Sequence, residues 1–125
     1  MTPENTAAQD PSGPLISVIV PCYNSERTIR QCLQSILNQH TSVSYDVLVV
    51  DSSTDRTAEI VRREFPSVRL IHLEKRAFSS AARNLGIRAT EAPFCWMIDS
   101  DCIASPDEIE RMLSRHHEAE YAAVA

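Results

Sequence analysis

The sequence predicts an α/β fold in which helices cover both faces of a mostly parallel sheet. Short apolar runs alternate with longer stretches whose apolar residues recur at helical spacing. The runs are apolar at consecutive positions, as expected for strands that are buried on both sides. They occupy residues 15–20, 45–50, 68–73 and 94–98, and residues 121–125 read as the start of a fifth. We therefore expect a three-layer α/β/α arrangement with four to five strands.

Three apolar stripes between these runs are typical of amphipathic helices. The stripes are Ile29, Cys32, Leu33, Ile36 and Leu37; Ala58, Val61 and Phe65; and Phe78, Ala82, Leu85 and Ala89. The second stripe stops before Pro66, which a helix rarely passes. Candidate N-caps precede the stripes: Asn24 or Ser25, Thr54 or Asp55, and Ser79 or Ser80.

A fourth helix is predicted after the last run. Ser105 suits its N-cap, Pro106 its first position and Glu108 its third. Its apolar stripe would be Ile109, Met112, Leu113 and His116. His116 and the adjacent His117 are far from the strand ends, so we expect structural roles for both.

Length and composition limit the possible functions. A chain of 125 residues forms one domain, and its net charge of -5 argues against general affinity for nucleic acid or anionic membranes. The longest apolar stretch, residues 15–20, is far short of the roughly 20 residues that a membrane helix needs. Residues 1–14 are rich in proline and small polar residues and are expected to form a disordered arm before the domain at 15–125. The four cysteines form no CxxC pair and follow no signal peptide, which favours reduced thiols and a cytoplasmic location.

The carboxyl ends of the predicted strands are the expected place for a ligand, because parallel α/β sheets bind ligands there. Asp51, Asp99 and Asp101 fall at these ends. Gathered at one edge, their carboxylates would repel one another unless they held a cation, and oxygen ligands suit Mg²⁺ or Mn²⁺. Aspartate is also common in turns, so these residues could equally be ordinary strand ends.

The main basic concentration near a strand end comprises Lys75, Arg76, Arg83 and Arg88. Arg83 could clamp a diphosphate from the first turns of a helix, whereas Lys75 and Arg88 read as a solvated helix face. Gly86 interrupts the same helical pattern. Such a glycine indicates close packing or the close approach of a ligand.

Four stretches, taken in order, resemble glycosyltransferase family 2. They are ISVIVPCYNSERTIRQCLQSILNQ, YDVLVVDSSTDRTAEIV, AARNLGIRAT and FCWMIDSDCIASPDEIERML. The resemblance covers residues 15–125 and implies the Rossmann-like GT-A fold, which binds a nucleotide-diphospho-sugar. It also implies inverting transfer of the sugar to an acceptor hydroxyl, with help from Mn²⁺ or Mg²⁺.

The resemblance also implies roles for individual residues. Pro21 and Tyr23 would line the nucleotide pocket, and Asp51 would accept a hydrogen bond from the base. Arg83 would lie near the base or diphosphate. Within DSDC, Asp99 would lie near the ribose, Ser100 would join the donor site, and Asp101 would hold the metal with Asp99. The acceptor, sugar and base are not indicated.

Two departures from the family pattern shape the functional hypotheses. The motif DSSTD is one residue shorter than the family's usual one and has no glycine, and the chain ends where family members continue. We therefore expect a domain truncated at its C-terminal end, which holds the donor-binding half and lacks the general base. The alternative is a non-catalytic nucleotide-binding or interaction module. A haloacid-dehalogenase-like phosphatase is disfavoured, because its DxD follows the first strand.

Overall fold

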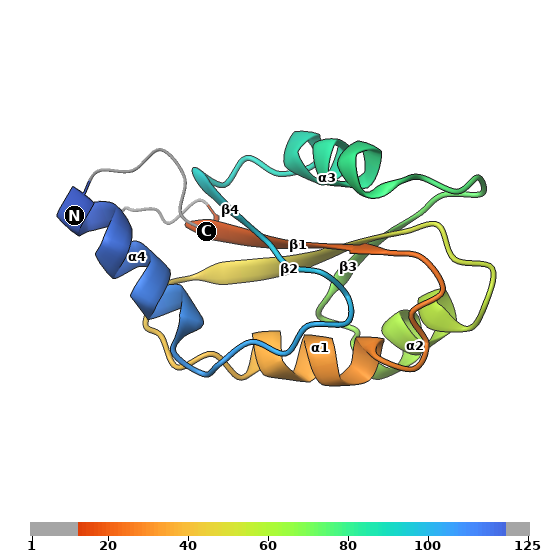
Figure 1. The fold of residues 1–125 in the computed structure, drawn as a ribbon, viewed down its shortest axis with the longest axis horizontal. Helices are drawn as coiled ribbons and strands as arrows, with labels where there is room; N and C mark the ends of the chain where they lie inside the picture. The colour runs from red at the N-terminus through yellow and green to blue at the C-terminus, as the bar shows by residue number, and fades with distance from the viewer. Residues whose placement is uncertain (1–12, 120–125) are drawn as a thin grey trace.

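The computed structural model describes residues 13–119 of the chain. A four-stranded parallel sheet, in the order β3-β2-β1-β4, forms its centre (Figure 1). The strands are β1 (Ile16–Cys22), β2 (Tyr45–Asp51), β3 (Arg69–His72) and β4 (Phe94–Met97). All neighbouring strands pair in parallel, so the predicted parallel sheet is confirmed. The fifth strand predicted from residue 121 and most of the predicted arm lie outside the described residues.

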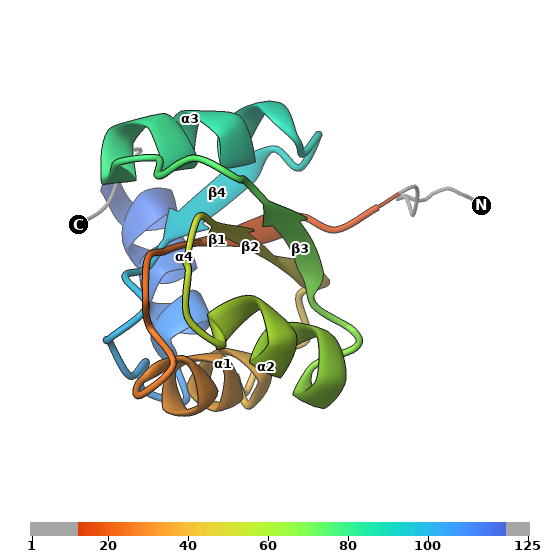
Figure 2. The same cartoon turned by 90° about the vertical axis from the view of Figure 1, so that its right-hand side faces the viewer.

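Helices cover both faces of this sheet, as predicted. They are α1 (Ile29–Leu37), α2 (Thr57–Glu64), α3 (Ser79–Arg88) and α4 (Glu108–Ala119). Figure 2 shows α3 on one face and α1 and α2 on the other. Ile109 of α4 is fully buried in the same apolar cluster as α1. Within the described residues, no helix combines the length and apolar character needed to span a bilayer.

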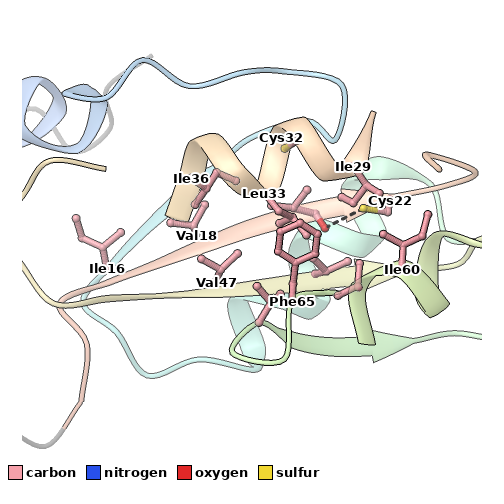
Figure 3. Packing of buried hydrophobic residues seen from close by; sticks show 14 of the residues in the cluster. Ile16, Val18, Cys22, Ile29, Cys32, Leu33, Ile36, Val47, Ile60 and Phe65 are labelled. Atoms are coloured by element: carbon pink, nitrogen blue, oxygen red, sulfur yellow. Dashed lines mark hydrogen bonds between the residues drawn. The ribbon is translucent and has the colours of Figure 1, made fainter. Parts of the chain in front are cut away.

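The central strand β1 explains why the apolar runs are uninterrupted. Val18 and Val20 enter the cluster beneath α1 and α2, whereas Ile19 faces the smaller cluster beneath α3. All three are fully buried. Side chains alternate between the faces of a strand, so burial on both faces requires apolar residues at successive positions. Figure 3 shows the larger cluster, where Leu33 and Phe65 pack over the strands.

The predicted helix stripes are largely buried, with two exceptions. Ile29, Cys32, Leu33 and Ile36 are fully buried, but Leu37 is 38% exposed because α1 ends there. Phe78 is 66% exposed and directly precedes α3, whose buried residues are Ala82 and Gly86. Its assignment to the third stripe was therefore wrong.

The residues predicted as N-caps of α1 and α3 do not stand directly before these helices. The residue before α1 is Thr28, and the one before α3 is Phe78; neither makes a side-chain capping bond. Ser25 contributes only its carbonyl oxygen, which accepts hydrogen bonds from the amides of Thr28 and Ile29. Helix α4 begins at Glu108, three residues after the expected cap, Ser105. The Ser105 hydroxyl nevertheless donates to the Glu108 carboxylate at 2.7 Å, and the Glu108 amide donates to the Ser105 carbonyl at 3.2 Å.

Asp55 does stabilise the start of α2, although the helix begins two residues later. Its carboxylate accepts hydrogen bonds from the Thr57 amide at 2.9 Å and the Thr57 hydroxyl at 2.6 Å. It also accepts one from the Glu26 amide at 3.4 Å. Burial opposes ionisation of Asp55, but these hydrogen bonds outweigh it and hold the pKa below its ordinary value.

Gly86 allows α3 to pack directly on β1. A Cβ at this position would lie 2.5 Å from Cγ2 of the fully buried Ile19. A real Cβ cannot approach so closely, and the β-branched Ile19 cannot swing aside within a packed core. Close packing therefore accounts for this glycine.

We predict that Gly86→Ala destabilises the fold. Overpacking costs about 1–3 kcal/mol, and the better helix propensity of alanine returns up to about 1 kcal/mol. We expect a net loss of about 1–2 kcal/mol in urea unfolding. Ser80→Ala, at an exposed position of the same helix, is the control. A Gly86→Ala variant as stable as the wild type would contradict this account of the packing.

We also predict that Asp55→Asn reduces stability at neutral pH. The folded pKa of Asp55 is lowered, so its ionised form stabilises the fold above the unfolded pKa of about 3.9. That contribution is lost as the pH falls through the folded pKa. The stability difference between variant and wild type should therefore shrink on acidification, as measured by denaturation at several pH values. A constant difference, or a matching loss in the exposed control Asp107→Asn, would contradict the prediction.

Candidate functional site

A hollow of about 780 Å³ opens at the carboxyl ends of β1 and β4. This volume lies within the usual range for small-molecule sites, which is about 300–1,000 Å³. Six of the residues assigned from the sequence line it: Pro21, Tyr23, Arg83, Asp99, Ser100 and Asp101. The fold therefore brings together residues that are up to 80 positions apart in the chain.

The loop after β1 is bonded to the loop after β2 through Asn24. Its φ of 51° lies in the left-handed region, which asparagine tolerates better than most residues. In this conformation, its side-chain oxygen accepts hydrogen bonds from the amides of Thr54 at 2.8 Å and Asp55 at 3.3 Å. Its own amide donates to the Ser53 hydroxyl at 2.7 Å. These bonds fix the first wall of the hollow.

Ser25 extends the connection to the loop after β4. Its amide donates to the Thr57 hydroxyl at 2.9 Å, and its hydroxyl shares a 2.7 Å hydrogen bond with the hydroxyl of Ser100. The Cys32 thiol donates to the Asp99 carbonyl at 3.5 Å. The DSDC segment is thus held through a hydroxyl and a backbone carbonyl.

Arg83 reaches this segment from α3. One of its terminal nitrogens donates to the Asp99 carboxylate at 3.0 Å, and both side chains are partly exposed. The Arg83 Nε atom is buried, and no atom of the described residues forms a hydrogen bond with it. A buried donor without a partner is costly, so this nitrogen is a point of strain beside the hollow.

Asp99, Asp101 and Cys102 form the candidate metal site. One ligand atom from each lies within 4.8 Å of the others, and all three residues are exposed. Burial and the charge of Asp101 raise the pKa of the Cys102 thiol, so this thiol is protonated at neutral pH. The two carboxylates remain as hard oxygen ligands, which fit Mg²⁺ or Mn²⁺.

Asp51 lies outside the residues that line the hollow. Its carboxylate is fully buried and accepts a hydrogen bond from the Ser53 hydroxyl at 2.5 Å. Its other oxygen lies 2.8 Å from Nδ1 of His72. The predicted contact between Asp51 and a base stays a prediction.

Sequence reasoning missed the roles of two residues. The contact of His72 with Asp51 was not predicted, because it depends on the register of β2 and β3. In that register the two residues are direct partners. Arg76 belonged to the predicted basic cluster but was given no role of its own. Its guanidinium carbon lies 4.0 Å from the centre of the Tyr23 ring.

The residues given structural or solvated roles lie away from the site. Lys75 and Arg88 are exposed and do not line the hollow. His116 packs edge-on against Phe94, with ring centres 5.1 Å apart, as a structural role requires. The side chain of His117 lies outside the described part of the structure.

The chain resembles bacterial glycosyltransferases in sequence. It is 36% identical over 102 residues to the uncharacterized glycosyltransferase EpsJ of Bacillus subtilis, covering 79% of this chain and 29% of EpsJ. It is 38% identical over 104 residues to the succinoglycan biosynthesis protein ExoO of Rhizobium meliloti, covering 82% of this chain and 30% of ExoO. The chain therefore spans about a third of the length of these relatives.

Solved structures share both sequence and fold with this chain. The S. aureus TarS structure in complex with UDP matches with a TM-score of 0.73 and 30% identity, covering 84% of this chain and 32% of TarS. The mannosyltransferase PcManGT of Pyrobaculum calidifontis, in complex with GDP-Man and Mn²⁺, matches with a TM-score of 0.71 and 29% identity. That match covers 87% of this chain and 34% of PcManGT.

The family model described as glycosyl transferase family 2 matches residues 17–125. That range includes all four strands and all four helices of the structure, apart from the first residue of β1. The chain belongs to glycosyl transferase family 2.

Proposed function

We propose that this chain binds a nucleotide-diphospho-sugar and provides the donor half of an inverting, metal-dependent transfer to an acceptor hydroxyl. The observation that carries the proposal is the hollow, where Arg83 and the DSDC carboxylates meet beside Tyr23. UDP, UDP-GlcNAc and GDP-Man complexes of similar structures support a donor of this class.

Six of the residues that line the hollow have a role in this proposal. Asp101 and Asp99 hold the cation, Asp99 also lies near the ribose, and Ser100 keeps their loop against Ser25. Pro21 and Tyr23 contact the nucleoside. Arg83, which lines the hollow, donates hydrogen bonds to the diphosphate. A bound divalent cation would offset the negative charge that develops on the departing diphosphate.

We propose that Asp51 accepts a hydrogen bond from the base, which requires a change in its present hydrogen bonds. Both of its carboxylate oxygens already have partners, Ser53 and His72. To accept a hydrogen bond from a base, the carboxylate would have to share or release one of them.

A second function is favoured by the length of the match. The chain spans about a third of its relatives, and we assign the general base to the remainder of such a protein. Without that remainder, the chain would act as a nucleotide-binding or interaction module.

We also propose a cytoplasmic location, because all four cysteines are free thiols.

We predict that UDP or GDP binds to the chain in a Mn²⁺-dependent manner and that Asp101→Ala weakens this binding strongly. The reason is that the variant loses a metal carboxylate next to the phosphates. Isothermal titration calorimetry with and without Mn²⁺ measures the effect. The control is Asp107→Ala, an exposed acid that does not line the hollow. Equal binding with and without the metal would remove the role assigned to Asp101.

We further predict that the chain alone releases sugar from UDP-GlcNAc or GDP-Man slowly at most and does not transfer it to an added acceptor. Donor binding without a general base positions the leaving group but does not activate a nucleophile. Chromatography of the reaction products distinguishes hydrolysis from transfer. Efficient transfer by the 125-residue chain would show that the general base lies within it.

A further inference from the structure

Arg76 occupies an unusual position at the rim of the hollow. Its guanidinium carbon lies 4.0 Å from the centre of the Tyr23 ring and 4.6 Å from the centre of the Phe78 ring. Cation–π contacts hold a guanidinium at this range. Two rings from different segments of the chain therefore hold one cation, which lines the hollow.

The way Arg76 is held leaves its hydrogen-bonding groups available. Aromatic rings engage the flat face of a guanidinium, whereas its five N–H donors lie in the plane and point outward from the edge. Within the described residues, no carboxylate forms an ion pair with Arg76. Arg83 differs in that one of its nitrogens is already committed to Asp99.

The charges around the hollow indicate what Arg76 would bind. The cation site at Asp99 and Asp101 and the guanidinium of Arg76 line the same hollow. A ligand that satisfies both must carry several negatively charged oxygens, as a diphosphate does. Arginine binds phosphate oxygens in a bidentate manner, which matches the exposed edge of this guanidinium.

We propose that Arg76 binds the phosphate groups of the nucleotide donor, and that Tyr23 and Phe78 hold its guanidinium in position for this. The inference rests on the proposed donor-binding function and adds a phosphate-binding residue to it. It also explains why Phe78 leaves a large aromatic side chain 66% exposed. In this proposal the Phe78 ring, 4.6 Å from the guanidinium carbon, helps to hold Arg76.

The test compares binding of UDP, UMP, uridine and inorganic pyrophosphate by the wild type and Arg76→Ala, with Mn²⁺ present throughout. We expect Arg76→Ala to weaken the binding of UDP and pyrophosphate by about tenfold or more, as the loss of one charge-assisted hydrogen bond implies. Binding of UMP should weaken less, and binding of uridine should be unaffected. GDP replaces UDP if the wild type prefers it.

Three results would overturn the proposal. Equal weakening of UDP and uridine would place Arg76 at the base. Tighter uridine binding by Arg76→Ala would mean that the guanidinium occupies the face of Tyr23 on which a base stacks. If wild type binds neither UDP nor GDP, the proposed donor function fails. If wild type binds and Arg76→Ala binds equally well, only the role of Arg76 fails.

Matched variants separate binding from folding. Lys75→Ala removes a neighbouring exposed cation that does not line the hollow, and it should leave all affinities unchanged. If Lys75→Ala lost as much affinity as Arg76→Ala, the effect would come from the change in net charge rather than from a contact of Arg76. Arg76→Lys keeps the charge but loses the planar fork, so it should recover only part of the UDP affinity. Circular dichroism and urea unfolding of each variant confirm that the fold is retained.

The role of Phe78 is tested by a double-mutant cycle. Phe78→Leu alone should weaken pyrophosphate binding less than Arg76→Ala does, because the arginine remains but loses one of its two rings. In the Arg76→Ala background, the same change should cause no further loss. Additive losses would show that Phe78 acts independently of Arg76 and would remove it from the proposal.

Discussion

The hydrogen-bonded junction of Asn24 and Ser25 is the constraint on which the site depends. Parallel strands direct their carboxyl ends to one edge of the sheet, but the loops beyond them have no ladder to hold them in place. Asn24 joins the loop after β1 to the loop after β2, and Ser25 adds the loop after β4 through Ser100. Three loops that are distant in sequence thereby form one rigid wall.

Helix packing completes this wall from the other face of the sheet. Because Gly86 has no Cβ, α3 lies directly against Ile19 of β1. That close approach brings Arg83, three residues earlier on the same helix, to the Asp99 carboxylate. Core packing and site geometry are therefore coupled, and a helix held further from the sheet would withdraw the arginine from the acidic segment.

Local patterns and tertiary contacts account for different parts of the outcome. The apolar patterns were sufficient to predict the strands, their burial on both faces and the main helix stripes. A strand that is buried on both faces needs apolar residues at successive positions, and this pattern is visible in the sequence. Parallel α/β sheets bind ligands at the carboxyl ends of their strands, and this rule was sufficient to expect Arg83, Asp99 and Asp101 at one edge of the sheet. The predicted cap of α1 failed because the side chains of Asn24 and Ser25 bind the loops after β2 and β4. The pairing of Asp51 with His72 depends on strand register, which no local pattern specifies.

The acidic segment is held by contacts that leave the Asp101 carboxylate available for a cation. The Asp99 carbonyl accepts the Cys32 thiol, and the Ser100 hydroxyl bonds to Ser25. The Asp101 carboxylate meets only the weak Cys102 thiol donor at 3.7 Å within the described residues. Fastening the loop by its backbone and a neutral hydroxyl leaves a carboxylate available without loosening the loop. The ordering cost of the segment is met on folding rather than on binding, which favours tighter association with a charged ligand.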